Sequence, residues 1–396
     1  MFQQSNLVKG MLCAALVPFV AGVSVQAQDV VKVANGVTSV KVGPYHGSPD
    51  FAHAKPMPMP EATMTEDAVH GLMNSLQTEH ISLGGSGLVA GSEGTGSRTE
   101  FAPVFLGAPE SGSETEGLQS DAVQPRPEDY GTSNLPFTTV RADLFGLNTN
   151  TSYPYRAVGK LFFDITSTGY SWCSGSMIKP GVVVTAAHCV AEFGQKKFHG
   201  GWEWVPGYSN GVAPYGVWTV AQAYVLTSYY NGTDPCAQSG VVCEDDVAVL
   251  VLNTQKGAYV GNTVGWFGYW YGGGFTSGGL AQITQLGYPG GLNSADYMER
   301  TDSQGYTSAA SSNNHIIGSN ENGGSSGGPW VENFGLPASL TGETNGYFPQ
   351  SNVIVGVTSW GSTSLLPKND GAAPFTSGNI QTLLNVACGA FPVACS

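Results

Sequence analysis

The hydrophobic pattern of this 396-residue chain changes about a third of the way along it. From Tyr155 onward, short apolar runs alternate with turn residues, which is the pattern of β-strands joined by tight turns. We predict strands at Ala157–Ile165, Ser176–Thr185, Val217–Leu226, Val247–Leu252, Leu280–Leu286 and Asn352–Trp360. No long helical repeat separates these runs. The pattern therefore predicts an all-β antiparallel fold and disfavours a parallel α/β fold.

Residues 28–135 differ from the rest of the chain. They are rich in Gly, Ser, Pro, Glu and Asp, and they hold 14 acidic and 5 basic residues, a net charge of −9. Only Glu61–Leu83 has apolar residues at helical spacing, and Lys55–Pro60, with proline at every second position, is predicted to be extended. Most of this part has too little apolar surface to fold alone. We interpret it as a removable prosegment; a flexible linker or surface tether is the alternative.

The first 27 residues read as a secretory signal peptide. Lys9 is the only charge, Met11–Val23 is apolar, and Val25-Gln26-Ala27 offers small residues for cleavage. A buried N-terminal helix is the alternative interpretation. No later apolar run is long enough to span a bilayer, and the net charge of −14 argues against a nucleic-acid partner. We predict a secreted protein, extracellular or periplasmic, divided at 1–27, 28–135 and 136–396.

Six cysteines remain after the signal peptide, an even number that suggests disulfides in an exported protein. They fall into three close pairs, Cys173 with Cys189, Cys236 with Cys243, and Cys388 with Cys395. Six cysteines allow fifteen pairings, so the connectivity stays open, although neighbour pairing is the natural prediction. Because no Cys-x-x-Cys spacing occurs, zinc is disfavoured. No motif requires a metal or an organic cofactor.

Three separate motifs supply the parts of an acyl-transfer site. His188 ends the run Thr185-Ala186-Ala187-His188-Cys189, Asp246 opens an apolar strand, and Ser326 lies in Gly324-Ser325-Ser326-Gly327-Gly328-Pro329. In such a site a serine attacks a carbonyl, a histidine takes its proton, and a carboxylate orients the imidazole. The competing residues are His199 and His315 for the base, Glu244 and Asp245 for the acid, and Ser325 for the nucleophile. The order His, Asp, Ser excludes an α/β-hydrolase, where histidine comes last.

These motifs resemble those of the chymotrypsin-fold, trypsin-like serine proteases, and most closely the bacterial glutamyl-endopeptidase (V8-like) branch. The further matches are Tyr153–Gly159, Cys173–Ile178 and Gly287–Gly290. The resemblance covers about residues 136–396. It implies two antiparallel six-stranded β-barrels with the active site between them, and a Cys173–Cys189 bridge beside the catalytic histidine. It also implies an oxyanion hole formed by the amides of Gly324 and Ser326.

The resemblance leads us to expect a secreted serine endopeptidase that acts as a monomer on protein or peptide substrates. The alternative is an inactive protease-fold protein that binds a matrix or a cell surface. The aromatic run Trp266–Phe275 could serve such binding, but a strand and hairpin loop is the favoured interpretation. Esterase activity would be a side reaction of the same chemistry.

By ungapped spacing, the specificity pocket is expected to include six residues: Asn320, Glu321, Thr358, Ser359, Trp360 and Gly361. The histidine typical of glutamate-selective members is replaced by Thr358, so glutamate selectivity is poorly supported. A carboxylate at Glu321 predicts cleavage after Arg or Lys, and a broad or neutral pocket is the alternative. Ser325 replaces the aspartate that pairs with a new N-terminus in trypsin-type enzymes, so activation works otherwise. We expect an activating cut near Val140-Arg141-Ala142.

Overall fold

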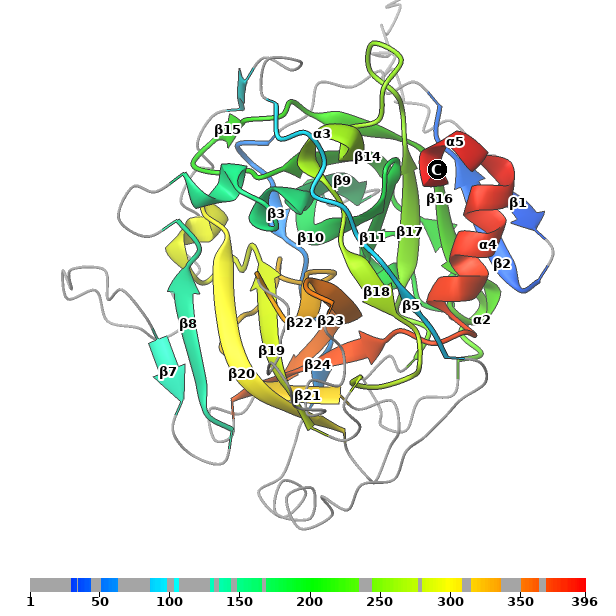
Figure 1. Cartoon of the computed structure of the whole chain (residues 1–396). Helices are drawn as coiled ribbons and strands as arrows, with labels where there is room; N and C mark the ends of the chain where they lie inside the picture. Colours follow the sequence, from blue (N-terminus) through cyan, green and yellow to red (C-terminus); the bar gives the residue numbers. More distant parts are fainter. Residues whose placement is uncertain are drawn as a thin grey trace, which may run out of the picture.

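Two β-sheets dominate the structure, and few helices accompany them (Figure 1). A computed structural model describes residues 30–33, 35–43, 51–62, 86–97, 103–106, 129–131, 135–143, 148–165, 169–234, 244–276, 280–307, 315–335, 350–362 and 368–396. The predicted signal peptide at 1–27 and the predicted pair of Cys236 with Cys243 lie outside these residues. None of the described helices combines the length and hydropathy needed to cross a membrane.

The first sheet closes into a six-stranded barrel, which we call the first barrel. Its strands follow the order β16-β14-β9-β10-β11-β17, and β17 pairs back with β16. The bounds are β9 Val158–Ile165, β10 Gly169–Lys179, β11 Val182–Thr185, β14 Gly200–Pro206, β16 Trp218–Leu226 and β17 Ala248–Leu252. β1 (Val30–Val33) and β2 (Val37–Lys41) extend this sheet from β16.

The second sheet combines strands from the later part of the chain with β7 and β8, which precede the first barrel in sequence. The order is β19-β22-β23-β24-β21-β20-β8-β7, and β19 also pairs with β20. The bounds are β7 Asp129–Gly131, β8 Phe137–Arg141, β19 Leu280–Gly287, β20 Glu299–Thr307, β21 His315–Gly318, β22 Pro329–Glu332, β23 Val353–Ser362 and β24 Asn369–Pro374. The predicted second barrel would correspond to this sheet, and it stays a prediction. The mostly-β, chymotrypsin-like architecture is confirmed.

Shorter elements complete the fold. The short strands are β3 Lys55–Pro56, β4 Glu61–Ala62, β5 Leu88–Val89, β6 Val104–Phe105, β12 Ala191–Glu192, β13 Lys197–Phe198, β15 Val212–Ala213 and β18 Gly268–Trp270. The α-helices are α2 Thr227–Asn231, α3 Gly261–Val264, α4 Ile380–Ala390 and α5 Pro392–Cys395. Helix α4 turns its apolar side to the first barrel, where Leu383 and Ala387 are buried.

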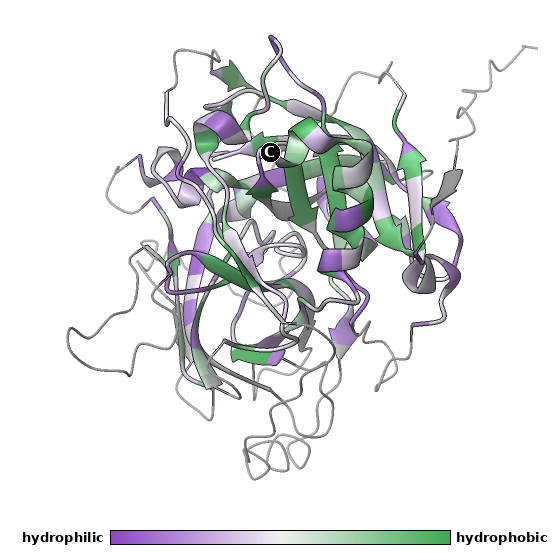
Figure 2. Cartoon of the chain, turned by 45° about the vertical axis from the view of Figure 1, so that its right-hand side comes forward, coloured by the Kyte–Doolittle hydropathy of each residue, from purple (hydrophilic) through white to green (hydrophobic). Residues whose placement is uncertain are grey.

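The core explains why the apolar runs became strands. Every residue of β11 and β17 is buried, because both strands lie between the barrel interior and covering elements. Tryptophans Trp202, Trp204 and Trp218 are buried in the same barrel. Figure 2 shows these strands largely in the green of hydrophobic residues. Burial of apolar surface stabilises the folded state by about 25 cal/mol per Å² and is the main stabilising contribution.

Five of the six predicted strands correspond to single strands with shifts of one or two residues at their ends. The prediction of one strand at Ser176–Thr185 was wrong. The chain turns at Pro180-Gly181, so the segment is split between β10 and β11, which pair with each other. The predicted helix Glu61–Leu83 was wrong at its start, since Glu61–Ala62 is strand β4 and pairs with β23. The remainder of that prediction lies outside the described residues.

A buried lysine gives the first barrel a measurable pH dependence. Lys160 on β9 is fully buried, and its Nζ donates to the carbonyl of Ala295 at 3.1 Å and lies 4.1 Å from the centre of the Trp172 ring. Burial lowers the pKa of Lys160 to about 7, against the opposing charge of Asp296. The unfolded chain keeps this proton up to about pH 10.4.

We therefore predict that Lys160 makes the protein more stable at pH 9.5 than at pH 7. Between these values the unfolded chain binds a proton that the folded chain lacks, so stability rises with pH by up to about 3 kcal/mol. Lys160→Met should remove this slope. Urea unfolding of both proteins at the two pH values measures it, and equal slopes in the two would contradict the prediction.

Candidate active site

His188 is fixed by the end of β11 and by a disulfide. The strand ends at Thr185, whose hydroxyl donates to the carbonyl of Ser174 at 2.8 Å, and the chain then forms a single 3-10 turn over Ala187–Cys189. Cys189 is bonded to Cys173 on β10. The histidine is thus held on both sides, and its small neighbours let it enter a buried site.

Asp246 holds His188 by two hydrogen bonds. Its Oδ2 lies 2.9 Å from the ring Nδ1, and its Oδ1 accepts from the backbone N–H of His188 at 2.9 Å. The Ser359 hydroxyl donates to the same Oδ2 at 2.5 Å. Asp246 is completely buried, so these donors are what make its charge tolerable. The contacts fix both the tautomer and the direction of the imidazole.

The two competing acids are turned elsewhere. Asp245 accepts a short hydrogen bond from the Ser228 hydroxyl, and its backbone N–H donates to Asp234 at 3.1 Å. Glu244 accepts from the Thr376 hydroxyl at 2.7 Å. Of the three consecutive acids, only Asp246 has a described contact with His188.

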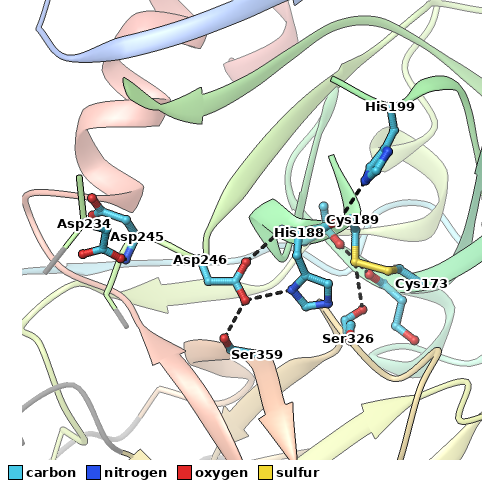
Figure 3. Close-up of polar contacts among 11 residues, drawn as sticks. Cys173, His188, Cys189, His199, Asp234, Asp245, Asp246, Ser326 and Ser359 are labelled. Carbon is cyan, nitrogen blue, oxygen red and sulfur yellow. Dashed lines mark hydrogen bonds and ion pairs between the residues drawn. A yellow bond between two sulfur atoms is a disulfide. The ribbon is translucent and has the colours of Figure 1, made fainter. Parts of the chain in front are cut away.

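Ser326 lies in a turn that the first barrel holds in place. The carbonyl of Ser326 accepts from the backbone N–H of Ser174 at 2.8 Å, and the Ser174 hydroxyl donates to the carbonyl of Gly324 at 2.9 Å. The neighbouring Ser325 hydroxyl instead donates to the carbonyl of Asn322 at 2.7 Å, which closes the turn. Ser325 therefore has a structural contact, and Figure 3 shows Ser326 beside His188.

Figure 3 shows the His188 ring between Asp246 and Ser326. The His188 Nε2 and the Ser326 Oγ are both buried, and neither has a hydrogen-bond partner among the described residues. Both residues adjoin Cys189, whose sulfur lies 3.9 Å from the Ser326 carbonyl oxygen. The structure therefore brings together the three residues that lie 58 and 80 positions apart in sequence.

The other two histidines of this region are buried and neutral. The His199 Nε2 lies 3.1 Å from the carbonyl oxygen of His188, and its ring stacks on Phe163. Burial lowers the pKa values of His199 and His315 to about 4. His199 thus supports the backbone of His188 and does not compete with it.

Cys173, His188 and Cys189 also have the donor types of a metal site, with ligand atoms within 4.8 Å of one another. The two sulfurs are joined in the disulfide, however, and offer no thiolate to an ion. This cluster therefore does not fit a zinc site. The structure also joins Cys388 to Cys395, which ties α4 to α5.

The residues expected to bind substrate form a buried polar cluster beside β23. The Thr358 hydroxyl accepts from the side chains of Gln285 and Trp330, each at 3.0 Å. The Glu321 Oε1 accepts from the Thr301 hydroxyl at 3.0 Å, while its Oε2 has no hydrogen-bond partner among the described residues. Asn320 is half-buried next to Glu321. Their role in binding a substrate stays a prediction.

Asp370 belongs to this cluster and was missed by the sequence analysis. Its Oδ2 accepts from Gln285 at 2.9 Å, and its Oδ1 has no hydrogen-bond partner among the described residues. Burial raises its pKa to about 6. Burial, and then the charge of Asp370, raise the pKa of Glu321 well above its usual range. Only the pairing of Gly361 with Asp370 across two strands could have revealed this residue.

The aromatic run Trp266–Phe275 is largely internal. Phe267, Tyr269 and Phe275 are buried, and the backbone of Trp266 pairs with Ser92. The run supplies strand β18, as the favoured interpretation expected. It does not form an exposed aromatic binding surface.

Comparison with known proteins identifies a protein family and two relatives that the chain resembles. The profile of the trypsin family matches residues 149–379. The chain is 28% identical over 210 residues to the glutamyl endopeptidase of Bacillus licheniformis, a match that covers 51% of this chain and 58% of that protein. It is 30% identical over 127 residues to an extracellular metalloprotease of Bacillus subtilis, covering 31% of this chain and 36% of that protein. The chain thus matches less than two thirds of the length of either relative.

Solved structures similar to the chain include two proteases. Protease Anisep from Arthrobacter nicotinovorans is 25% identical, with 59% of this chain and 96% of that chain covered and a TM-score of 0.47. A thermostable serine protease, AL20, from an extremophilic microorganism is 23% identical, with 59% and 97% covered and a TM-score of 0.46. Both TM-scores lie below 0.5.

Proposed function

Because the chain belongs to the trypsin family of serine proteases, we propose that it is a secreted endopeptidase with a catalytic triad of His188, Asp246 and Ser326. One observation carries the proposal. The His188 Nδ1 is held 2.9 Å from Asp246, while the buried Nε2 and the Ser326 Oγ, on neighbouring residues of the site (Figure 3), have no hydrogen-bond partner among the described residues and are free to bond to each other. That is the arrangement in which an imidazole can take a proton from a hydroxyl.

The reaction follows from these positions. Ser326 Oγ attacks the substrate carbonyl and passes its proton to the His188 Nε2, while Asp246 stabilises the imidazolium that forms. The developing oxyanion is met by the backbone amides of Gly324 and Ser326. His188 then gives the proton to the leaving amine, and water releases the acyl group by the same steps in reverse. No step requires a metal or an organic cofactor.

An active-site-directed organophosphonate tests this proposal. It should label Ser326 in the secreted protein, and His188→Ala should abolish the labelling. Mass mapping of the labelled peptide identifies the residue. A label at Ser325, or labelling that persists without His188, would overturn the assignment.

We further propose a preference for Arg or Lys before the scissile bond. Glu321 and Asp370 each present one buried carboxyl oxygen without a hydrogen-bond partner among the described residues. Asp370 lies beside Gly361 of the expected specificity pocket, because a Cβ placed on Gly361 would lie 3.1 Å from its Oδ1. A cation entering between two such groups restores their ionised forms and gains strength from the low local dielectric.

Glu321→Gln is predicted to lower kcat/KM for Arg substrates at least tenfold relative to Phe substrates, since it removes one charge from this cluster. Discrimination should also fall as the pH drops through about 6, where Asp370 takes up a proton. Peptides varied only at the residue before the scissile bond measure both effects. Equal turnover of Arg, Phe and Glu peptides by the unmodified enzyme would contradict the preference.

The proposed boundaries are a signal peptide at 1–27, a prosegment at 28–135 and a protease domain at 136–396. Arg141 ends strand β8, and the N–H of Ala142 donates to the carbonyl of Met298 at 2.8 Å. A cut there requires this strand end to detach from β20. N-terminal sequencing of the secreted enzyme tests the placement, and a start far outside residues 130–145 would contradict it.

A further inference from the structure

A segment of the predicted prosegment runs through the proposed substrate site. We call residues 54–62 the strap. In Figure 1 it is the blue chain at β3 that passes from the sheet holding β10 toward the sheet holding β23. At one end, β3 pairs in parallel with β10, and the N–H of Met57 donates to the carbonyl of Trp172 at 2.9 Å. At the other end, β4 pairs in parallel with β23.

The middle of the strap covers the proposed oxyanion hole. The backbone N–H of Gly324 donates to the carbonyl of Met57 at 3.0 Å. This amide is one of the two proposed to stabilise the negative charge of the oxyanion. In the strap-bound chain a neutral carbonyl, that of Met57, occupies the amide instead. The next anchor is the N–H of Gly361, which donates to the carbonyl of Pro60 at 3.0 Å.

The strap runs in the direction opposite to a substrate, a step that rests on the proposed function. If the residue before the scissile bond binds at Glu321 and Gly361, the part of the substrate before that bond lies along β23. The part after the bond, which leaves as the amine product, then lies toward β10. The strap instead places Lys55 and Pro56 on β10 and Glu61 on β23. The Met57 carbonyl is bonded to the nitrogen of Pro58. This nitrogen therefore lies toward β23, whereas the leaving nitrogen of a substrate would lie toward β10.

Side chains of the strap fit the same site. Met59 is buried, and a Cβ placed on Gly361 would lie 2.8 Å from its Cε. The same Cβ would lie 3.1 Å from the Asp370 Oδ1, so an uncharged methionine adjoins the acidic cluster. Pro56 packs on Gly290 at the other end, where an added Cβ would lie 2.8 Å from its Cγ.

The alternation of proline in Pro56–Pro60 suits this path. Each proline keeps the preceding residue extended, so the free strap loses little conformational entropy when it binds. Proline also has no N–H that would need a partner on the open side of the cleft. Pro58, at the exposed middle position, uses this property.

We propose that the active-site cleft is also a binding site for an extended, proline-alternating peptide that runs opposite to a substrate, and that residues 54–62 are its occupant. In this orientation the strap blocks the Gly324 amide and resists cleavage. Removing the strap opens the site, which provides activation without the salt bridge that Ser325 cannot form.

The test measures how fast an organophosphonate labels Ser326 in the uncut full-length chain. Met59→Glu, which sets a carboxylate against Asp370, should speed labelling at least tenfold. Met59→Ala is a second variant, for use if Met59→Glu folds poorly, and it should raise the labelling rate by a smaller factor. Thermal unfolding shows whether each variant is folded. Lys41→Glu is the control, because it also adds an acid, at an exposed side chain outside the strap, and should leave the rate unchanged.

A peptide of residues 53–62 should slow the labelling of the Met59→Glu chain and stay intact by mass spectrometry. The reversed sequence, with the same composition, should not slow it. Equal rates in all chains with normal labelling of Ser326, or cleavage of the peptide, would overturn the strap but leave the proposed function standing. Absence of labelling in every chain would overturn the proposed function itself.

Discussion

Replacing His188 by alanine is expected to lower kcat for a peptide substrate by about 10⁶-fold while the chain stays folded. Asp246 holds Nδ1, which leaves Nε2 as the only ring nitrogen available to Ser326. His199 cannot substitute, because its Nε2 is held at the backbone of His188. Steady-state hydrolysis of a chromogenic peptide measures the effect, with both enzymes in the same processing state and thermal unfolding as the check on folding.

The double variant His188→Ala with Ser326→Ala sharpens this prediction. Residues that act as one unit lose nearly everything with the first replacement, so the double variant should be no slower than either single variant. Asp246→Asn should cost less, about 10⁴-fold, because an amide would favour the wrong histidine tautomer. Losses that multiply in the double variant would show that the two residues act independently and would contradict the triad.

The candidate site could be proposed from the sequence, because each part carries a local signal. An aspartate that opens a fully apolar strand needs a buried partner, and the resemblance to the protease family's strand motif selected Asp246 over Asp245 and Glu244. The glycine pattern distinguished Ser326 from Ser325, and the structure gives the reason in the Ser325 hydroxyl bond to Asn322. These choices depended on neighbours within a few residues.

Long-range pairing was not readable. β20 (Glu299–Thr307) and β24 (Asn369–Pro374) are polar in sequence yet lie inside the second sheet. There the Thr301 and Thr139 hydroxyls bond to each other, and the Thr284 hydroxyl donates to Asp302. Their composition looks like loop. Asp370 joins the site only through the register of β23 against β24. The helical spacing after Glu61 likewise gave no sign that Glu61 would pair with Gly361.

Gly324→Ala is expected to lower kcat about 10²- to 10³-fold with little change in KM, the usual effect of losing one oxyanion donor. Gly324 has a φ of +96°, which favours glycine. A Cβ there would lie 2.4 Å from the Trp172 Nε1 and 2.6 Å from the Tyr288 carbonyl oxygen. These two atoms form a hydrogen bond of 3.0 Å, so the added methyl group would collide with both of them. The backbone N–H of residue 324 would then turn away from the position of the oxyanion.

Gly335→Ala is the matched control. Gly335 has a similar φ of +90°, but a Cβ there would meet nothing within 4 Å. Both variants should lose about 1–2 kcal/mol of unfolding free energy to the left-handed backbone. Only Gly324→Ala adds the collision, so only it should lose activity. If Gly324→Ala keeps the kcat of the unmodified enzyme, as Gly335→Ala should, the Gly324 amide does not stabilise the oxyanion. If both variants lose activity to the same extent, backbone strain is the common cause. A loss confined to Gly324 ties the rate to one N–H whose direction is set by the hydrogen bond between Trp172 and Tyr288.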